Sequence, residues 1–193
     1  MAYYKNVGLI GKARSGKDTV AQRLGRTFAY TRVAFADPLK DMALRLNPAI
    51  PGLIKLDWDE TYRLSDAVED LGWERAKDEL PEVRRVLQNI GQGVREHDED
   101  FWVRVALRKI DAAEKWNLPV VVTDVRYENE ALALRQRGFA LIRVTRPGAG
   151  AGENAEHKSE TALDYVKTDL TIGNTGTLDD LNRIVDSLLL PRS

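Results

Sequence analysis

The sequence feature that most constrains the fold is the segment Gly11–Thr19, which reads GKARSGKDT. It matches the pattern G-x-x-x-x-G-K, in which glycines allow a tight turn and backbone N–H groups point inward to cradle phosphate oxygens. Residues 5–10 before it read as a short buried strand, and Val20, Leu24 and Phe28 after it recur every four positions, as in an amphipathic helix. A strand, a glycine-containing loop and a helix in this order predict a phosphate-binding turn.

Each position of this loop has an expected role. Gly11 and Gly16 permit the turn, and Lys17 is placed to reach the β- and γ-phosphates of a bound nucleoside triphosphate. Asp18 stands where the pattern expects Ser or Thr to ligate Mg²⁺, and Thr19 offers a hydroxyl one residue later. Whether Asp18 holds the water shell of the metal therefore stays open. A glycine-containing turn that binds no ligand is the simpler alternative.

The rest of the chain alternates predicted strands and helices. Further strands are predicted at residues 31–36, 120–123, 139–145 and 170–173, each followed or bounded by turn residues or an apolar pattern of helical spacing. Between residues 57 and 116 no strand pattern appears, so this stretch is predicted to be a helical insertion. Strands that alternate with helices favour a parallel sheet in an α/β fold.

Length and composition are those of a single globular domain. The 193 residues are 43% hydrophobic and 31% charged and include no cysteine, which excludes a disulfide scaffold, thiolate metal sites and a cysteine nucleophile. We expect one domain over residues 1–193, with a core made of residues 1–47 and 117–193 and a helical region at about 48–116.

No segment of the sequence is a candidate for insertion in a membrane. The longest apolar run, Leu118–Val122, is far shorter than the roughly 18 residues that would span a bilayer. Residues 1–6 are polar and lack the apolar segment of a secretory signal. We therefore expect a cytoplasmic protein with no membrane partner.

The charges are balanced overall but unevenly distributed along the chain. The formal net charge is −1, yet residues 1–56 hold 10 basic and 3 acidic side chains, whereas residues 57–100 hold 6 and 14. A protein that binds nucleic acid needs a basic stripe along one face, and this distribution argues against one. The basic first segment contains the phosphate motif, so small anions are the expected ligands.

A second candidate group is Asp124-x-Arg126, directly after the strand VVVT at residues 120–123. In a parallel sheet a central strand ends at the edge where ligands bind, which is also the edge of the phosphate loop. Asp124 could hold Mg²⁺ through water, and Arg126 could neutralise charge on a transferring phosphoryl group. An ordinary ion pair at the end of a strand is the structural alternative.

A third candidate group lies on a predicted helix with an apolar stripe over residues 83–90. At about 100° per residue, four polar side chains cluster on the opposite side if Gly91 does not break the helix: Arg84, Gln88, Gln92 and Arg95. Arginine binds phosphate in a fork, and glutamine can donate and accept at the edge of a base. Asp37, a predicted N-cap, and Lys40 could lie opposite this face. A solvated helix face is the commoner meaning of such a pattern.

The stretch at about residues 147–160 is predicted to be a mobile lid, because PGAGAGENAEHK is too rich in glycine and polar residues for a fixed element. Arg143 and Arg146 stand next to it, and arginines there could close over a triphosphate and exclude water. The two histidines, His97 and His157, have no partners at metal-ligand spacing.

Taken together, these motifs resemble the deoxynucleoside monophosphate kinases encoded by bacteriophages. The resemblance runs from residue 5 to about 185 and is carried by GKARSGKDT, FADPLK, R-x-x-L-Q-x-x-G, DVRYENE and HKSE. It implies a P-loop nucleotide kinase fold with a central five-stranded parallel sheet in the order 2-3-1-4-5, flanked by helices, with a helical acceptor-binding region and a lid. It also implies that ATP and Mg²⁺ are used to convert a deoxynucleoside monophosphate to the diphosphate.

The resemblance also implies a role for each matching residue. The ATP phosphates would be bound by the loop, including Ser15, with Arg14 and Lys17 bridging toward the acceptor, and Asp124 and Arg126 would complete the centre. Arg146 would contact ATP, and Asn174 would lie near adenine. The residues implied to hold the acceptor nucleotide are Asp37, Lys40, Arg84, Gln88 and Arg95, with Trp102 nearby as a contact to its base or sugar.

Two other functions stay open at this point. The segment GKARSGKD also resembles the phosphomevalonate kinases of animals, although FADPLK and the helix of Gln88 favour a nucleotide acceptor. The second alternative is an ATP-binding switch, which is disfavoured because no acidic pair follows VVVT and no basic stripe exists for DNA. The preferred base, the choice between deoxyribose and ribose, and a monomeric or homodimeric state are left open by the sequence.

Overall fold

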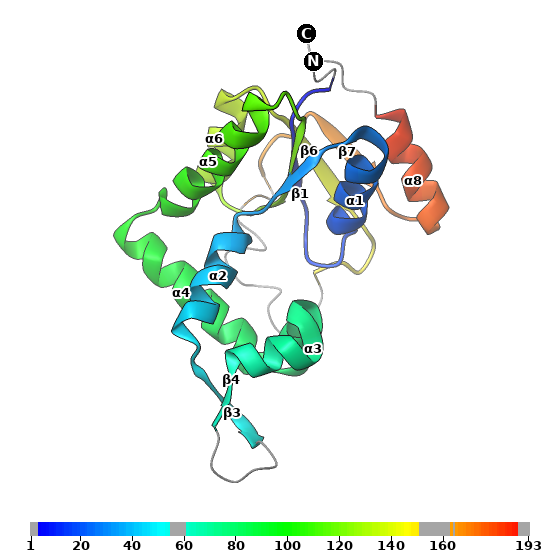
Figure 1. Ribbon diagram of the computed structural model, residues 1–193. Coiled ribbons are helices and arrows are strands. Elements are labelled where there is room, and N and C mark those ends of the chain that lie inside the picture. The colour runs from blue at the N-terminus through cyan, green and yellow to red at the C-terminus, as the bar shows by residue number, and fades with distance from the viewer. Residues whose placement is uncertain (1–3, 55–60, 151–162, 164, 189–193) are drawn as a thin grey trace. The chain divides into compact units, whose positions relative to one another are not determined.

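The computed structural model describes residues 4–54, 61–150, 163 and 165–188. The chain divides into two compact units, one made of residues 36–102 and the other of residues 1–35 with 103–193 (Figure 1). The first unit begins earlier and ends earlier than the helical region expected at about 48–116. None of the helices in these described stretches is long and apolar enough to cross a bilayer.

The larger unit contains a parallel sheet of five strands (Figure 1). Its strands are β1 (Val7–Ile10), β2 (Thr31–Val33), β5 (Val120–Val125), β6 (Ala140–Thr145) and β7 (Leu170–Gly173). Their order is β2-β5-β1-β6-β7. Counted within this sheet alone, that order is 2-3-1-4-5, which confirms the predicted fold class and topology. The strand with the phosphate loop at its end is therefore central.

The sheet is buried on both faces because its strands alternate between two apolar clusters. Val120 and Val122 of β5 pack in one cluster with Ile110 of α5 (Phe101–Lys115), whereas Val121 packs in the other with Val20 of α1 (Lys17–Phe28). Figure 1 shows α1 and α8 (Leu178–Ser187) on one side of the sheet and α5 and α6 (Glu128–Gln136) on the other. A continuous β-branched run is what a parallel strand covered on both faces requires.

A bidentate ion pair connects the first and last helices. Arg23 of α1 donates from Nε and Nη2 to the two carboxylate oxygens of Asp186 on α8, at 2.7 and 2.5 Å. These hydrogen bonds and the positive charge of Arg23 lower the pKa of the Asp186 carboxyl below its ordinary value of 3.8. Both side chains are partly exposed, so the pair contributes modestly to stability.

We expect the contribution of this pair to disappear in acid. A carboxyl whose pKa is lowered by folding stabilises the protein above its ordinary pKa and loses that effect as the pH falls through the lowered value. The Tm of Asp186→Asn should therefore lie below that of the unmodified protein at neutral pH, and the gap should close as the pH drops below 3.8. Thermal melts over this range measure it, with the exposed Asp41→Asn as control. A gap that is constant with pH would contradict the assignment.

The smaller unit is built from helices and one antiparallel hairpin. Its elements are α2 (Ala36–Leu46), β3 (Ala49–Ile54), β4 (Thr61–Arg63), α3 (Leu64–Glu79) and α4 (Pro81–His97). The stripe predicted over residues 83–90 packs in the apolar cluster of this unit. Gly91 does not break α4. A Cβ at Gly91 would lie 3.3 Å from Leu39, so this glycine allows α2 and α4 to pack closely.

Two expectations about this region are wrong. The stretch 57–116 contains a strand after all, since Thr61–Arg63 pairs with Ala49–Ile54. Pro51 in the sequence AIPGLI reads as a breaker, yet proline is tolerated in a strand that has a free edge. Asp37 is not an N-cap, because α2 already begins at Ala36 and Asp37 lies in its first turn. An acidic side chain is still favourable there, at the positive end of the helix dipole.

Candidate active site

The phosphate loop has a backbone that only glycine fits at two positions. Gly11 has a φ of +153° and Gly16 a φ of +108°, both within the region that favours glycine. A Cβ at Gly11 would lie 2.3 Å from the carbonyl oxygen of Val144, and a Cβ at Gly16 would lie 2.6 Å from Nδ2 of Asn174. Both glycines of the sequence motif are therefore required by conformation and by close packing.

The ammonium group of Lys17 lies inside this loop. Its Nζ donates to the carbonyl oxygens of Gly11 and Lys12 at 2.6 and 2.7 Å, and the side chain is buried, with 8% of its surface exposed. The lysine stands at the start of α1, directly after Gly16. The loop and the N-terminus of the helix thus concentrate positive charge at one place, as a phosphate group requires.

A buried hydroxyl also belongs to this loop. Ser15 is 1% exposed, and across the described part of the chain its Oγ is the buried side-chain polar atom with no hydrogen-bond partner. Ser15 lines the cavity beside the loop. A buried hydroxyl without a partner is costly, so a ligand or an ordered water is expected to satisfy it.

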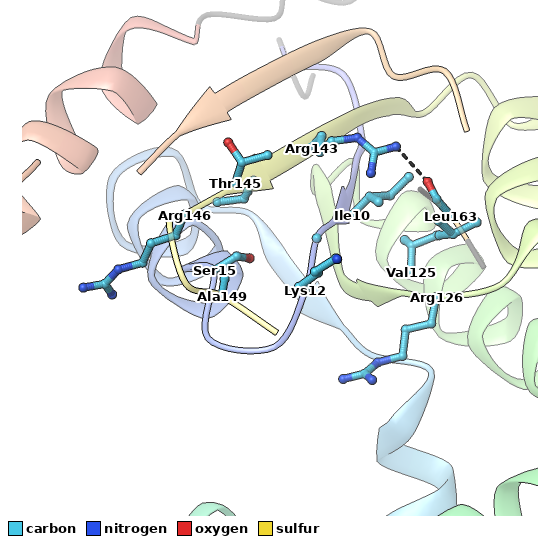
Figure 2. Close-up of a pocket in the computed structure, with 12 residues that line it drawn as sticks. Ile10, Lys12, Ser15, Val125, Arg126, Arg143, Thr145, Arg146, Ala149 and Leu163 are labelled. Atoms are coloured by element: carbon cyan, nitrogen blue, oxygen red, sulfur yellow. Dashed lines mark hydrogen bonds between the residues drawn. The ribbon is translucent and has the colours of Figure 1, made fainter. Parts of the chain in front are cut away.

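The cavity beside the loop has a volume of about 280 Å³ and is bordered by cations. Figure 2 shows it between the loop and the ends of β1, β5 and β6. Lys12, Arg126, Arg143 and Arg146 line it, and none of its lining residues is acidic. Concentrated positive charge at the carboxyl edge of a parallel sheet makes the cavity a site for an anion.

Asp124 and Arg126 are held in place by backbone contacts at the end of β5. Oδ1 of Asp124 accepts from the backbone N–H of Phe35, at 2.8 Å, and so joins β5 to the chain after β2. The backbone N–H groups of Arg126 and Tyr127 donate to the carboxylate of Glu130, at 2.8 and 3.2 Å. The cavity is bordered by Arg126 and, on the loop side, by Ser15, so Arg126 reaches the same cavity as the phosphate loop, whereas Asp124 is not among its lining residues.

Glu130 is a positioning residue to which the sequence analysis gave no role. It is 1% exposed and lies in the first turn of α6, where its carboxylate accepts from the N–H groups that precede the helix. A Glu three residues after the residue that begins a helix is a known capping signal, and DVRYENE contains it. The capping signal is therefore present in the sequence, but only the structure shows that this carboxylate is buried and accepts from the backbone N–H of Arg126.

The two arginines beside the predicted lid differ in position. Arg143 lies on β6, and its Nη2 donates to the carbonyl oxygens of Leu163 and Val166 at 2.8 and 2.7 Å. It therefore anchors Leu163 and Val166, which follow the predicted lid, to the sheet. Arg146 lies just after β6 and is exposed, and in Figure 2 its guanidinium points away from Arg143.

The residues implied to hold the acceptor all belong to the unit of residues 36–102. On α2, Nζ of Lys40 lies 5.5 Å from the centre of the Trp73 ring. On α4, Arg84 pairs with Asp78 at 3.1 Å. Asp37, Gln88 and Arg95 are partly exposed on the same two helices, and binding by all five stays a prediction.

Trp102, implied to contact the base or sugar of the acceptor, is buried in the unit of residues 36–102. It is 2% exposed, and its indole N–H donates to the carbonyl oxygen of Gly91 at 3.3 Å. The ring therefore supports α4 from inside the unit. A direct contact of Trp102 with the acceptor stays a prediction.

Comparison with known proteins identifies the family. The sequence model for deoxynucleotide monophosphate kinase matches residues 57–185. The chain belongs to the deoxynucleotide monophosphate kinase family. The deoxynucleotide monophosphate kinase of Enterobacteria phage T4 is 25% identical over 92% of this chain and 95% of its own length. A protein of Acanthamoeba polyphaga mimivirus is 29% identical over 90% of both chains.

A solved structure supports the fold of this kinase. Dephospho-CoA kinase from Campylobacter jejuni superposes with a TM-score of 0.51, covering 95% of this chain and 94% of that one, at 15% identity. At that identity the likeness shows the fold alone. The family match confirms three expectations from the sequence. These are the resemblance itself, the enzyme class and the phosphorylation of deoxynucleoside monophosphates.

The predicted lid, at about residues 147–160, falls only partly within the described residues. Residues 151–160, which include His157, lie outside the described residues. Residues 147–150 run beside the phosphate loop, since the N–H of Gly150 donates to the carbonyl oxygen of Ala13 at 3.1 Å. Within the described stretches no group of three or more His, Cys, Asp or Glu side chains could hold a metal ion.

Proposed function

We propose that this kinase binds ATP with its phosphate loop and transfers the γ-phosphoryl group in line to the 5′-phosphate of a deoxynucleoside monophosphate. The observation that carries the proposal is the cavity between the loop and Arg126, which is lined by cations and by no acidic residue. Two cationic side chains from different elements then act on the same triphosphate: Lys17, at the start of α1, and Arg126, directly after β5.

The transfer needs no covalent enzyme intermediate. An oxygen of the acceptor phosphate attacks the γ-phosphorus, and the bond from that phosphorus to the oxygen that bridges the β- and γ-phosphates breaks. Negative charge spreads over the equatorial oxygens and the leaving oxygen in the transition state. Lys17 and Arg126 stabilise this charge by position, with Arg14 and Arg146 as further contacts from the loop and the start of the lid.

The donor groups of this chain are compatible with Mg²⁺. This ion is held by one or two carboxylates together with substrate phosphates and water, so it does not need a cluster of protein ligands. Asp18, exposed in the first turn of α1, and Asp124, at the end of β5, would hold it through water, and the hydroxyl of Thr19 is near in sequence. The bound ion would neutralise charge on the phosphates.

The acceptor nucleotide is held by residues of α2 and α4. Arg84 and Arg95 suit its phosphate because a guanidinium forms two parallel hydrogen bonds to phosphate oxygens. Gln88, between them on α4, suits the edge of a base because its amide donates and accepts. Asp37 and Lys40 complete the set from α2.

Turnover with different acceptors tests this function. We expect ADP production to rise steeply when deoxynucleoside monophosphates are added to protein, ATP and Mg²⁺. Water alone should be a poor acceptor, because kinases exclude it from the closed site. A coupled ADP assay over all deoxynucleoside and ribonucleoside monophosphates, with phosphomevalonate as the competing acceptor, measures this and gives the base preference.

The same assay separates the alternatives. Turnover with phosphomevalonate alone would assign a different acceptor class, which the family match does not favour. ATP hydrolysis that does not respond to any acceptor would indicate an ATP-binding switch. Absence of both turnover and an ATP-dependent rise in Tm would mean that the loop binds no nucleotide.

A further inference from the structure

Asn174 follows β7 and is fixed at both its backbone and its side chain. Its backbone N–H donates to the carbonyl oxygen of Thr145 at 2.7 Å. Its side-chain Nδ2 donates to the carbonyl oxygen of Ser15 at 3.0 Å. The residue is 9% exposed. Asn174 therefore connects the end of β6 with the phosphate loop, whose Ser15 lies 159 positions before it in the sequence.

The amide of Asn174 packs directly against the peptide that joins Ser15 to Gly16. A Cβ at Gly16 would lie 2.6 Å from Nδ2 of Asn174 and 3.5 Å from Leu181 of α8. Any side chain at Gly16 would displace the asparagine. The glycine is thus needed for the contact as well as for its left-handed backbone.

This contact determines the direction of one loop N–H group. In a planar trans peptide the C=O and the N–H point in opposite directions. Because Asn174 holds the C=O of Ser15 on the buried side, the N–H of Gly16 in the same peptide is turned away from Asn174. Inward-pointing N–H groups of such a loop are the donors that bind phosphate oxygens.

We propose that Asn174 is a positioning residue, which orients the Ser15–Gly16 peptide so that the N–H of Gly16 can donate to a phosphate of ATP. It acts on ATP through the loop and does not need to touch adenine. This inference rests on the proposed function in one respect, namely that the loop holds the phosphates of ATP. The hydrogen bond itself is independent of any activity.

Three variants test this role: Asn174→Ala, Asn174→Asp and, as the matched control, Thr175→Ala at the exposed next position. In protein without nucleotide, amide hydrogen exchange over residues 11–17 should be faster in both Asn174 variants than in the control. Exchange should be faster in Asn174→Asp than in Asn174→Ala, because a carboxylate would face the carbonyl oxygen of Ser15 and repel it. Exchange in α3 and α4 should not change.

In the kinase assay the KM for ATP should rise about tenfold in Asn174→Ala, as for the loss of one buried hydrogen bond. The KM for the acceptor should stay within twofold. Unchanged exchange over residues 11–17 overturns the proposal, and so does an unchanged KM for ATP alongside faster exchange. Faster exchange throughout the sheet with a large fall in Tm also overturns it, since a residue that only stabilises the fold behaves in this way. If the unmodified protein phosphorylates no acceptor, the proposed function fails, while the exchange measurement still decides whether Asn174 holds the Ser15–Gly16 peptide in place.

Discussion

Replacing Lys17 by Met should lower kcat about 10³-fold or more, since a preorganised cationic donor at a developing charge accounts for that order of rate. Lys17 is 8% exposed, and its ammonium lies 2.6 and 2.7 Å from two loop carbonyl oxygens. Methionine keeps the unbranched side chain up to the position of Cε and removes the charged amine. Single-turnover measurements with saturating ATP and acceptor would separate this loss from weaker binding.

The control for this variant is Lys109→Met, which removes one positive charge from an exposed position on α5. We expect it to leave kcat unchanged. Circular dichroism and Tm of Lys17→Met should be compared with those of the control, because the lysine also holds the loop carbonyls. A kcat for Lys17→Met within tenfold of the unmodified protein, with the fold intact, would show that the lysine does not act on the transferring group.

The second large effect is expected at Arg126. Arg126→Ala should lower kcat roughly 10³-fold or more if the guanidinium stabilises the transition state as an arginine finger does. The structure supports this role because Arg126 borders the same cavity as the phosphate loop, and because Glu130 holds its backbone. The KM for ATP should change far less than kcat, since the interaction is strongest in the transition state.

Two further variants sharpen the experiment at Arg126. Arg126→Lys keeps the charge but loses the planar fork, so it should recover only part of the activity. Arg108→Ala, at an exposed position of α5, controls for a change in net charge. If Arg126→Ala retains a kcat near that of the control, Arg126 has no part in the chemistry, and another cation of the cavity must supply the charge.

Much of the fold could be predicted from local patterns. The run Val120–Val122 is fully β-branched and is buried on both faces of the sheet, and Gly11 and Gly16 occupy the conformations that the motif demands. The stripe over residues 83–90 forms the apolar side of α4. These signals are strong because spacing, residue type and neighbouring turns agree in each case.

Other features could not be predicted, since they depend on partners far away in the chain. β3 contains Pro51 and Gly52, which read as breakers, and its pairing with β4 becomes visible only in space. The role of Asn174 depends on the carbonyl oxygen of Ser15, 159 positions earlier. No short stretch of sequence contains both residues of this pair. The expectation that the side chain of Asn174 lies near adenine came from the family resemblance alone.

The position of β1 in the middle of the sheet has a consequence for biosynthesis. Val7 of this strand pairs with Val121 of β5 on one side and with Ala140 of β6 on the other. The ribosome makes both of these neighbouring strands long after it makes β1. The phosphate loop is therefore translated before both neighbours of its strand, and it acquires its final surroundings only after they have been made. Until those neighbours are made, both edges of β1 lack their partners, and unpaired strand edges make a partly folded chain prone to aggregation.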